Sequence, residues 1–283
     1  MATLICAAPA KLNLFLHVVG RREDGYHLLE TVFRFIAYGD TVTLTLRDDG
    51  LVVREYDLPD VPEKQDLCLR AARLLQQVSG VDYGVSIALD KRLPMGGGLG
   101  GGSSDAASVL LGLNQLWHLH IPRQVLQDLA LQLGADVPVF IFGRSAFAQG
   151  VGEVLQSVVL DTAWYLVLMP DAHVATPKIF ASEQLTRNTK SVRIADFSRA
   201  EIFSDLTKND LQSVVCEMYP AVAEAVTLLS QYGLARMTGS GACVFSVFGC
   251  EADALSVLSK IPAHIRGFVA QGLDSHPLKN FAV

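Results

Sequence analysis

The sequence predicts an α+β fold of two lobes. Its 283 residues exceed an average domain of roughly 100–200 residues, and half of them are hydrophobic, which is enough apolar surface for packed cores. Segments with strand periodicity and segments with helix periodicity occur on both sides of the middle of the chain. The character of the sequence changes beyond Gly150-Val151-Gly152, so we place a boundary near residue 160, with lobes of residues 1–160 and 161–283.

The start of the chain predicts a β meander. Apolar residues alternate with other residues over 11–18, the period of a strand with one face in the core, so Lys11 and Asn13 point to the same side. Further strands are expected over residues 31–36 and 41–46, the second after the turn signal of a Gly-Asp pair.

The middle of the first lobe predicts the order strand, glycine loop, helix. A helix over residues 67–78 ends before Gly80, as helices often end before a glycine. An alternating strand over residues 85–89 then leads into a glycine-rich run and a helix over residues 104–116. The other expected elements are a helix over residues 122–133 that meets a second helix at Asp136, a strand over residues 165–169, a helix that starts at Thr176-Pro177 and a strand over residues 244–248.

The glycine-rich run is the candidate phosphate-binding segment. Its glycines remove the Cβ atoms that keep a polyanion at a distance and permit left-handed backbone angles, so successive N–H groups can turn toward phosphate oxygens. The helix that follows adds unpaired N–H groups and the positive end of its dipole. We therefore expect the phosphate tail of a nucleotide to bind here. The residues of this run that are expected to contact it, and that the resemblance given below assigns to ATP, are Pro94, Met95, Gly96, Gly97, Gly98, Leu99, Gly100, Gly101, Gly102, Ser103 and Ser104.

Three other interpretations of the run are less favoured. A flexible linker does not normally join a strand directly to a strongly helix-forming segment. Gly96, Gly98 and Gly101 match the G-x-G-x-x-G pattern of dinucleotide binding, but no acidic residue lies about 20 residues further on. A Walker P-loop is excluded, because no Gly-Lys-Ser/Thr ends the run.

The composition argues against several partners and locations. A net charge of −6 and a pI near 5.6 do not suit a phosphate-backbone footprint. The five cysteines form no C-x-x-C pair, which favours a reducing compartment. Residues 1–10 lack the basic region of a signal peptide, and no apolar run has membrane-spanning length. We expect a cytoplasmic monomer or weak homodimer without a nucleic-acid or membrane partner.

Three motifs resemble those of the GHMP kinase superfamily. They are Ala8-Pro9-Ala10-Lys11-Leu12-Asn13-Leu14, the run from Pro94 to Ala107, and Met237-Thr238-Gly239-Ser240-Gly241-Ala242-Cys243. Asp24-Gly25-Tyr26-His27 and Gly134-Ala135-Asp136-Val137-Pro138 resemble the branch of the superfamily whose substrate is a cytidylated methylerythritol. The resemblance covers nearly the whole chain. It implies two lobes with the active site in the cleft between them, and a left-handed βαβ unit around the phosphate loop.

The same resemblance implies a reaction and catalytic residues. The reaction is transfer of the γ-phosphoryl group of ATP to the C2 hydroxyl of the cytidylated sugar alcohol, in non-mevalonate isoprenoid precursor biosynthesis. Asp136 is the implied base, and Lys11 holds it ionised or screens charge on the transferring group. From the residues alone, Asp136 is better explained as the N-cap of the helix begun by Pro138, and Lys11 as a solvated residue of an edge strand, and only the resemblance reverses this order.

The resemblance also implies the binding residues. The implied substrate contacts are Asn13, Tyr26, His27, Phe33, Asp136 and Phe180. At the adenine, Asp66 stands where that branch usually has Asn, and an acidic group there can accept from an amino group. Mg²⁺ is expected to arrive with the nucleotide, and Ser104 is its expected protein ligand. Two alternatives remain: a GHMP kinase for a mevalonate-like or homoserine-like alcohol, and a non-catalytic sensor on the same fold.

Overall fold

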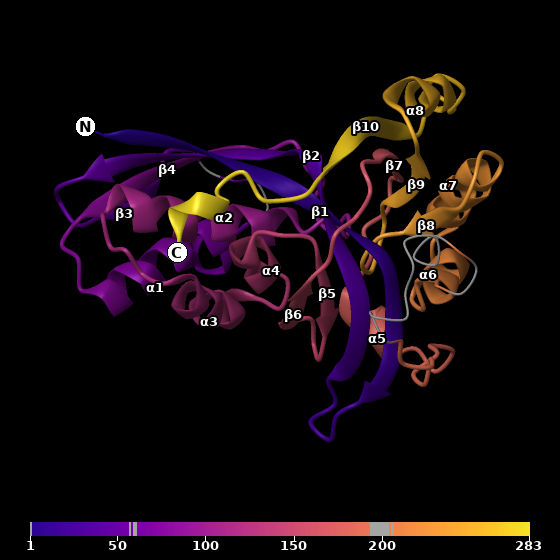
Figure 1. Ribbon diagram of the computed structural model, residues 1–283, viewed down its shortest axis with the longest axis horizontal. Helices are drawn as coiled ribbons and strands as arrows, with labels where there is room; N and C mark the ends of the chain where they lie inside the picture. Colours follow the sequence, from indigo (N-terminus) through magenta and orange to yellow (C-terminus); the bar gives the residue numbers. More distant parts are fainter. Residues whose placement is uncertain (1, 57, 59–60, 193–203, 205–206) are drawn as a thin grey trace.

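The computed structural model describes residues 2–56, 58, 61–192, 204 and 207–283 (Figure 1). Its strands are β1 (Thr3–Arg21), β2 (His27–Arg47), β3 (Val52–Arg54), β4 (Gly84–Asp90), β5 (Ala146–Gln149), β6 (Val154–Ser157), β7 (Trp164–Met169), β8 (Ala235–Met237), β9 (Val244–Phe248) and β10 (Arg266–Leu273). Its α-helices are α1 (Leu67–Ser79), α2 (Gly101–Leu116), α3 (Arg123–Leu133), α4 (Val137–Phe142), α5 (Thr176–Ala181), α6 (Gln212–Met218), α7 (Pro220–Ser230) and α8 (Glu251–Leu258), with short 3-10 helices η1 (Glu63–Gln65) and η4 (Lys279–Phe281). The fold is therefore α+β, as predicted.

The strands of the described segments join in one sheet. Its order is β3-β4-β2-β10-β7-β9-β8, with β1 and β5 paired to β2 and β6 paired to β5. β3 and β4 are parallel, and α1 connects them, which makes the βαβ unit beside the glycine loop. No helix in the described segments is long and apolar enough to cross a bilayer.

Strand β2 is continuous where the sequence predicts two strands. The Gly-Asp pair at residues 39 and 40 reads as a turn, but Gly39 lies opposite Pro9 of β1 within the ladder. A Cβ on Gly39 would lie 2.2 Å from the carbonyl oxygen of Ala8, so this glycine permits close approach of two strands and not a turn. The β-meander prediction is wrong at this point.

Strand β1 is buried on both faces, and not only on one. From Ala8 to Val18 each of its residues is buried. Leu12 and Leu14 join a core cluster with Tyr165 and Phe245 of the second half of the chain. The odd-numbered Lys11 and Asn13 lie on the same side of the strand, as predicted, but they are enclosed and not solvated.

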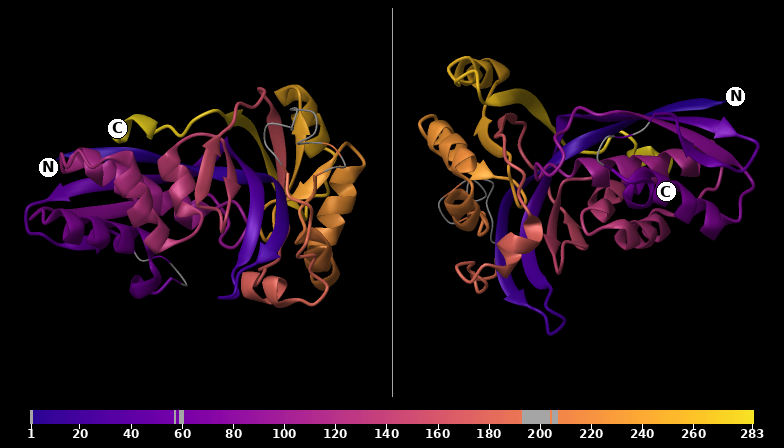
Figure 2. Two further views of the ribbon diagram at one scale, coloured as in Figure 1. Left: turned by 60° about the horizontal axis from the view of Figure 1, so that its bottom comes forward. Right: turned by 180° about the vertical axis from the view of Figure 1, so that it is seen from behind.

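The helices pack in two groups on either side of the β1–β2 pair (Figures 1 and 2). Helices α1 to α4 form one core with β2 and β4, and helices α5 to α8 form another with β7 to β9. Strand β10 pairs with both β7 and β2, and the C-terminal residues Leu278 and Ala282 return to the first core. The lobe boundary near residue 160 stays a prediction.

Candidate active site

The glycine loop lies between β4 and α2 and takes the backbone conformations that its glycines allow. Gly96, Gly98 and Gly100 have φ values of 69°, 75° and 71°, in the left-handed region that glycine adopts without strain. Helix α2 begins at Gly101, earlier than predicted, since the N–H of Ser104 already donates to the carbonyl of Gly100 at 2.8 Å. The first N–H groups of α2 therefore belong to the glycine run itself and have no partner within the helix.

The loop is held against the third sequence motif. A Cβ on Gly98 would lie 2.1 Å from the carbonyl oxygen of Thr238, so the two loops touch through their backbones. The Thr238 hydroxyl donates to the Gly98 carbonyl at 3.4 Å and accepts from the N–H of Asn13 at 2.9 Å. Leu99 is buried, and its carbonyl accepts from the N–H of Lys11 at 3.0 Å. The loop is thereby fixed to both β1 and the 238–241 turn.

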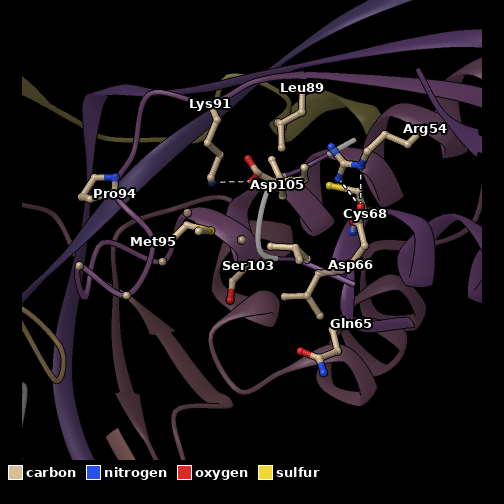
Figure 3. Close-up of a pocket in the computed structure, with 18 of the residues that line it drawn as sticks. Arg54, Gln65, Asp66, Cys68, Leu89, Lys91, Pro94, Met95, Ser103 and Asp105 are labelled. Atoms are coloured by element: carbon tan, nitrogen blue, oxygen red, sulfur yellow. Dashed lines mark hydrogen bonds and ion pairs between the residues drawn. The ribbon is translucent and has the colours of Figure 1, made fainter. Parts of the chain in front are cut away.

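A cavity of about 430 Å³ opens over the loop and the start of α1 (Figure 3). Pro94 and Met95 stand opposite Asp66 and Arg54 in this view. The predicted loop residues that line the cavity are Pro94, Met95, Gly96, Gly97, Gly98, Gly100, Gly101, Gly102 and Ser103. The backbone of the glycine run and the start of α2 thus line one side of this cavity, an arrangement that can bind an anion through N–H groups.

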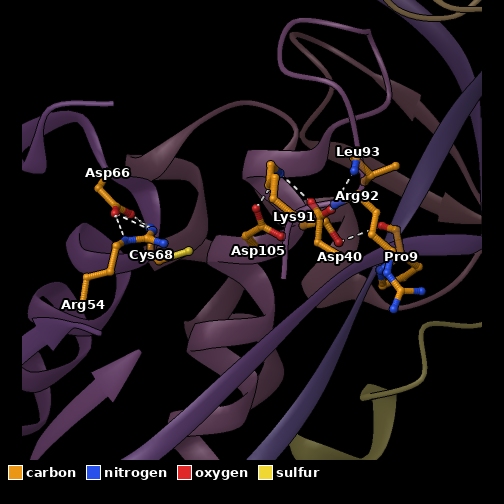
Figure 4. A network of polar contacts seen from close by, with 10 residues as sticks. Pro9, Asp40, Arg54, Asp66, Cys68, Lys91, Arg92, Leu93 and Asp105 are labelled. Carbon is orange, nitrogen blue, oxygen red and sulfur yellow. Dashed lines mark hydrogen bonds and ion pairs between the residues drawn. The ribbon is translucent and has the colours of Figure 1, made fainter. Parts of the chain in front are cut away.

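Asp66 lies in the wall of this cavity, but its carboxylate is already occupied. It caps α1, because Oδ1 accepts from the N–H groups of Cys68 at 2.9 Å and Leu69 at 3.3 Å. Its Oδ2 accepts from Nε of Arg54 at 2.6 Å (Figure 4). The acidic charge that replaces the usual Asn is therefore neutralised by Arg54, a cavity residue that the sequence did not reveal.

A buried triad lies at the base of the loop (Figure 4). Lys91 donates to Asp40 at 2.5 Å and to Asp105 at 2.8 Å, and the N–H groups of Arg92 and Leu93 donate to Asp40 at 2.6 and 2.8 Å. Burial raises the pKa of Asp105 to about 7, although Lys91 opposes the shift. Burial by itself lowers the pKa of Lys91, but the two carboxylates outweigh it and the net shift is upward. The triad fixes the chain where β4 enters the loop.

Asp136 and Lys11 meet in a second cavity, of about 360 Å³. Lys11 Nζ lies 3.1 Å from Asp136 Oδ2, and the side chains are 3% and 39% exposed. Asp136 is at the N-cap position of α4, yet its side chain accepts no capping hydrogen bond. The carboxylate is thus turned to Lys11 and the cavity, and capping does not account for it.

A hydrogen-bonded chain orients Lys11. Its Nζ donates to Asn13 Oδ1 at 2.5 Å, Asn13 Nδ2 donates to the Thr31 hydroxyl at 2.9 Å, and that hydroxyl donates to the carbonyl of Phe15 at 2.5 Å. The Phe33 ring lies 5.4 Å from Nζ and completes the wall. Because Thr31 accepts from the amide nitrogen, the amide oxygen of Asn13 must face Lys11.

Thr31→Val should therefore slow turnover without changing the shape of the site. The valine leaves the Asn13 amide N–H and the Phe15 carbonyl unpaired, so we expect kcat to fall about tenfold and stability to fall by roughly 1–3 kcal/mol, while KM for ATP stays nearly constant. Steady-state kinetics and thermal unfolding check this. Thr31→Ser keeps the hydroxyl and is the control; equal turnover in both variants would contradict the role.

Three aromatic residues, Tyr26, His27 and Phe180, help to line a third cavity, of about 610 Å³. The His27 and Phe180 rings face each other with centroids 4.9 Å apart and a tilt of 32°, and the Tyr26 side chain is exposed at the rim. Phe180 lies on α5, which begins at Thr176 as predicted. An apolar slot with ring faces and a few polar atoms suits a flat heterocyclic base.

The three cavities adjoin one another. Ser103 lines both the loop cavity and the Lys11–Asp136 cavity. Ala135, Thr176 and Phe180 line both the Lys11–Asp136 cavity and the aromatic cavity. A phosphate site, a carboxylate–ammonium pair and an aromatic slot therefore follow one another along a continuous hollow.

Comparison with known proteins identifies the family. The GHMP kinases N terminal domain matches residues 66–144, and the GHMP kinases C terminal domain matches residues 192–267. The 4-diphosphocytidyl-2-C-methyl-D-erythritol kinase of Thiobacillus denitrificans is 61% identical over 97% of this chain and 97% of its own length. That of Nitrosospira multiformis is 57% identical over 99% of this chain and 95% of its own length. The chain belongs to the 4-diphosphocytidyl-2-C-methyl-D-erythritol kinase family.

Solved structures agree with the assignment to this kinase family. A crystal structure of 4-(cytidine 5'-diphospho)-2C-methyl-D-erythritol kinase superposes with a TM-score of 0.83 at 32% identity, over 95% of this chain and 99% of that chain. The mevalonate kinase of Methanococcus jannaschii superposes with a TM-score of 0.69 at 14% identity, over 96% and 99% of the two chains, and shares the fold. GHMP kinase structures have the two-lobed architecture that the sequence predicts.

Most of the predicted site residues line one of the three cavities, but Ser104 and Leu99 do not. Ser104 is fully buried, and its hydroxyl donates to the carbonyl of Pro9 at 2.7 Å. Leu99 packs in the core between the two halves. The sequence missed Arg54 and Thr31, because each acts through a partner elsewhere in the chain and neither carries a local motif.

Proposed function

We propose that the protein phosphorylates the C2 hydroxyl of 4-diphosphocytidyl-2-C-methyl-D-erythritol with ATP, giving the 2-phosphate and ADP. The proposal rests mainly on the three cavities that adjoin one another in the structure. The glycine loop receives the phosphates of ATP, the Lys11–Asp136 pair receives the acceptor hydroxyl, and the aromatic slot receives the cytosine. The names of the close relatives support the same substrate.

In this proposal, Asp136 takes the proton of the acceptor hydroxyl. Phosphoryl transfer through a loose transition state needs positioning and charge stabilisation more than covalent help. The Asp136 carboxylate lies in the cavity between the phosphate site and the aromatic slot, which is where the hydroxyl must lie. Lys11, almost completely buried, supplies a fixed positive charge beside the transferring group.

We propose that Mg²⁺ is held mainly by the nucleotide. The described residues contain no cluster of three or more His, Cys, Asp or Glu side chains that suits a metal ion. A site without such a cluster suits Mg²⁺, because this ion commonly keeps several waters and uses one or two protein ligands together with substrate phosphates. Ser103 borders both the loop cavity and the central cavity and is the proposed protein ligand, better placed than the buried Ser104. The bound ion would neutralise charge on the phosphates.

We also propose that the nucleotide-binding and C-terminal lobes divide near residue 160. ATP contacts would then come from the first lobe, with Asp66, Met95 and the glycine run. Substrate contacts would come from both lobes, since Asn13, Tyr26, His27 and Phe33 precede the boundary and Phe180 follows it.

A substrate panel tests the proposed function. ADP release is measured with ATP and Mg²⁺ in the presence of 4-diphosphocytidyl-2-C-methyl-D-erythritol, mevalonate or homoserine. We expect turnover with the cytidylated erythritol alone, because mevalonate and homoserine have no heterocyclic base to fill the aromatic slot. Turnover with mevalonate or homoserine would contradict the proposal and favour another GHMP kinase activity. Binding of nucleotide and ligand without ADP release would favour the non-catalytic sensor.

A further inference from the structure

Arg187 contacts both members of the His27–Phe180 ring pair that lines the third cavity. Its terminal nitrogen Nη2 donates to the carbonyls of Phe180 at 3.0 Å and Ser182 at 2.7 Å, at the C-terminal end of α5, and Nη1 donates to Leu185 at 3.2 Å. Its Nε donates to Nε2 of His27 at 3.1 Å. One planar guanidinium thus fixes both the helix that carries Phe180 and the imidazole that faces it.

This contact sets the tautomer of His27. A guanidinium has donors only, so Nε2 of His27 must accept and must carry no hydrogen. Burial, with the positive charges of Arg187 and Arg21, lowers the pKa of His27, so the ring is neutral at neutral pH. In a neutral imidazole the single proton then lies on Nδ1, although free histidine prefers it on Nε2.

Nδ1 of His27 is the ring nitrogen left for a ligand. No hydrogen bond within the described residues uses it, and it is not among their enclosed, unpaired polar atoms. His27 lines the aromatic cavity together with Tyr26 and Phe180. Nδ1 is therefore an accessible hydrogen-bond donor on a residue that lines the cavity, and Arg187 fixes its polarity.

We propose that Arg187 is a positioning residue that locks His27 as an Nδ1–H donor and thereby selects cytosine over uracil. The N3 atom of cytosine accepts a hydrogen bond, whereas N3 of uracil carries a hydrogen and would oppose a fixed donor. The inference deepens the proposed function, because it assigns the base selectivity of the same substrate site. Without Arg187 the imidazole can move its proton to Nε2, and Nδ1 can then accept from uracil.

The tautomer is tested first, by nitrogen NMR of protein labelled with ¹⁵N-histidine. The spectrum of the wild-type chain should show His27 as the Nδ1–H form, with assignment from the loss of its signals in His27→Asn. Arg187→Gln should shift the ring toward the Nε2–H form. A wild-type His27 with its proton on Nε2 would overturn the proposal, whatever the chain phosphorylates.

Base selectivity is tested by calorimetric titration with cytidine 5′-diphosphate and uridine 5′-diphosphate. We expect Arg187→Gln to reduce the preference for the cytidine compound about tenfold, the usual effect of one mismatched buried polar contact. Lys190→Gln removes an exposed charge from the same segment and should leave the preference unchanged. An unaltered preference in Arg187→Gln, or no binding of either nucleotide to the wild type, would overturn the inference.

A double variant shows whether Arg187 acts by fixing the tautomer of His27 or only by holding α5 in place. In His27→Phe the ring has neither a donor nor an acceptor nitrogen, so adding Arg187→Gln should change the remaining preference less than about twofold. An equal tenfold loss in that background would assign Arg187 to holding α5 alone. Because these readings use nucleotide diphosphates and not turnover, the proposed function can fail while the inference stands.

Discussion

Asp136→Asn is expected to reduce kcat by roughly 10²–10⁴ while the protein stays folded and binds ATP normally. The amide keeps the size of the side chain but cannot take the proton of the acceptor hydroxyl, and its contact with Lys11 loses the charge attraction. Stability should change little, because the Asp136 side chain caps no helix N–H and is 39% exposed. Single-turnover measurement of phosphoryl transfer, with thermal unfolding and ATP titration alongside, checks each part.

A matched control tests whether the loss of turnover depends on where the carboxylate is removed. Asp128→Asn removes a carboxylate from the exposed side of α3 and should retain normal turnover. If Asp136→Asn retained a near-normal rate as well, Asp136 would lose its place as the base. If it lost rate only through unfolding, thermal scans would reveal the fall in stability.

Gly102→Ala is expected to weaken ATP binding about tenfold or more, near 1.4 kcal/mol, without loss of stability. A Cβ at Gly102 would have only ordinary contact with Leu67, at 3.6 Å, so the folded chain accommodates it. Alanine also favours a helix over glycine, and Gly102 lies in the first turn of α2. The added methyl group would instead occupy cavity space where the loop backbone approaches the phosphates.

Two further glycines make this prediction specific. Gly98→Val must displace the Thr238 carbonyl, 2.1 Å from the new Cβ, so it should lower both stability and ATP affinity. Gly249→Ala meets nothing within 4 Å and should change neither. Unchanged ATP affinity in Gly102→Ala, measured by calorimetry, would remove the glycine loop from the phosphate site.

The parts of the structure that depend on local sequence were predictable. The helix that ends at Gly80, the strand before the glycine loop and the helix that starts at Thr176 all follow from periodicity and end signals. The continuity of β2 was not, because the same Gly-Asp signal serves a turn or a close strand contact. Only the partner strand, with Ala8 opposite Gly39, decides between them.

The candidate site divides in the same way. The glycine run and Asp136 carry motifs, so the sequence located them and a family resemblance gave them roles. Arg187 was invisible because its partner His27 lies 160 residues away, and Thr31 acts on Asn13 at a separation of 18. Arg54 reaches Asp66 only once β3 is laid beside β4.

The continuous strand β2 sets the length of the molecule that can span the hollow. Phe33, beside Lys11, and His27, at the aromatic slot, lie on this one strand, and at the ordinary strand rise they are about 20 Å apart. Hydrogen bonds to β1 along β2 hold that interval. A compound whose tether between hydroxyl and base is too short can fill either end of the hollow, but not both together.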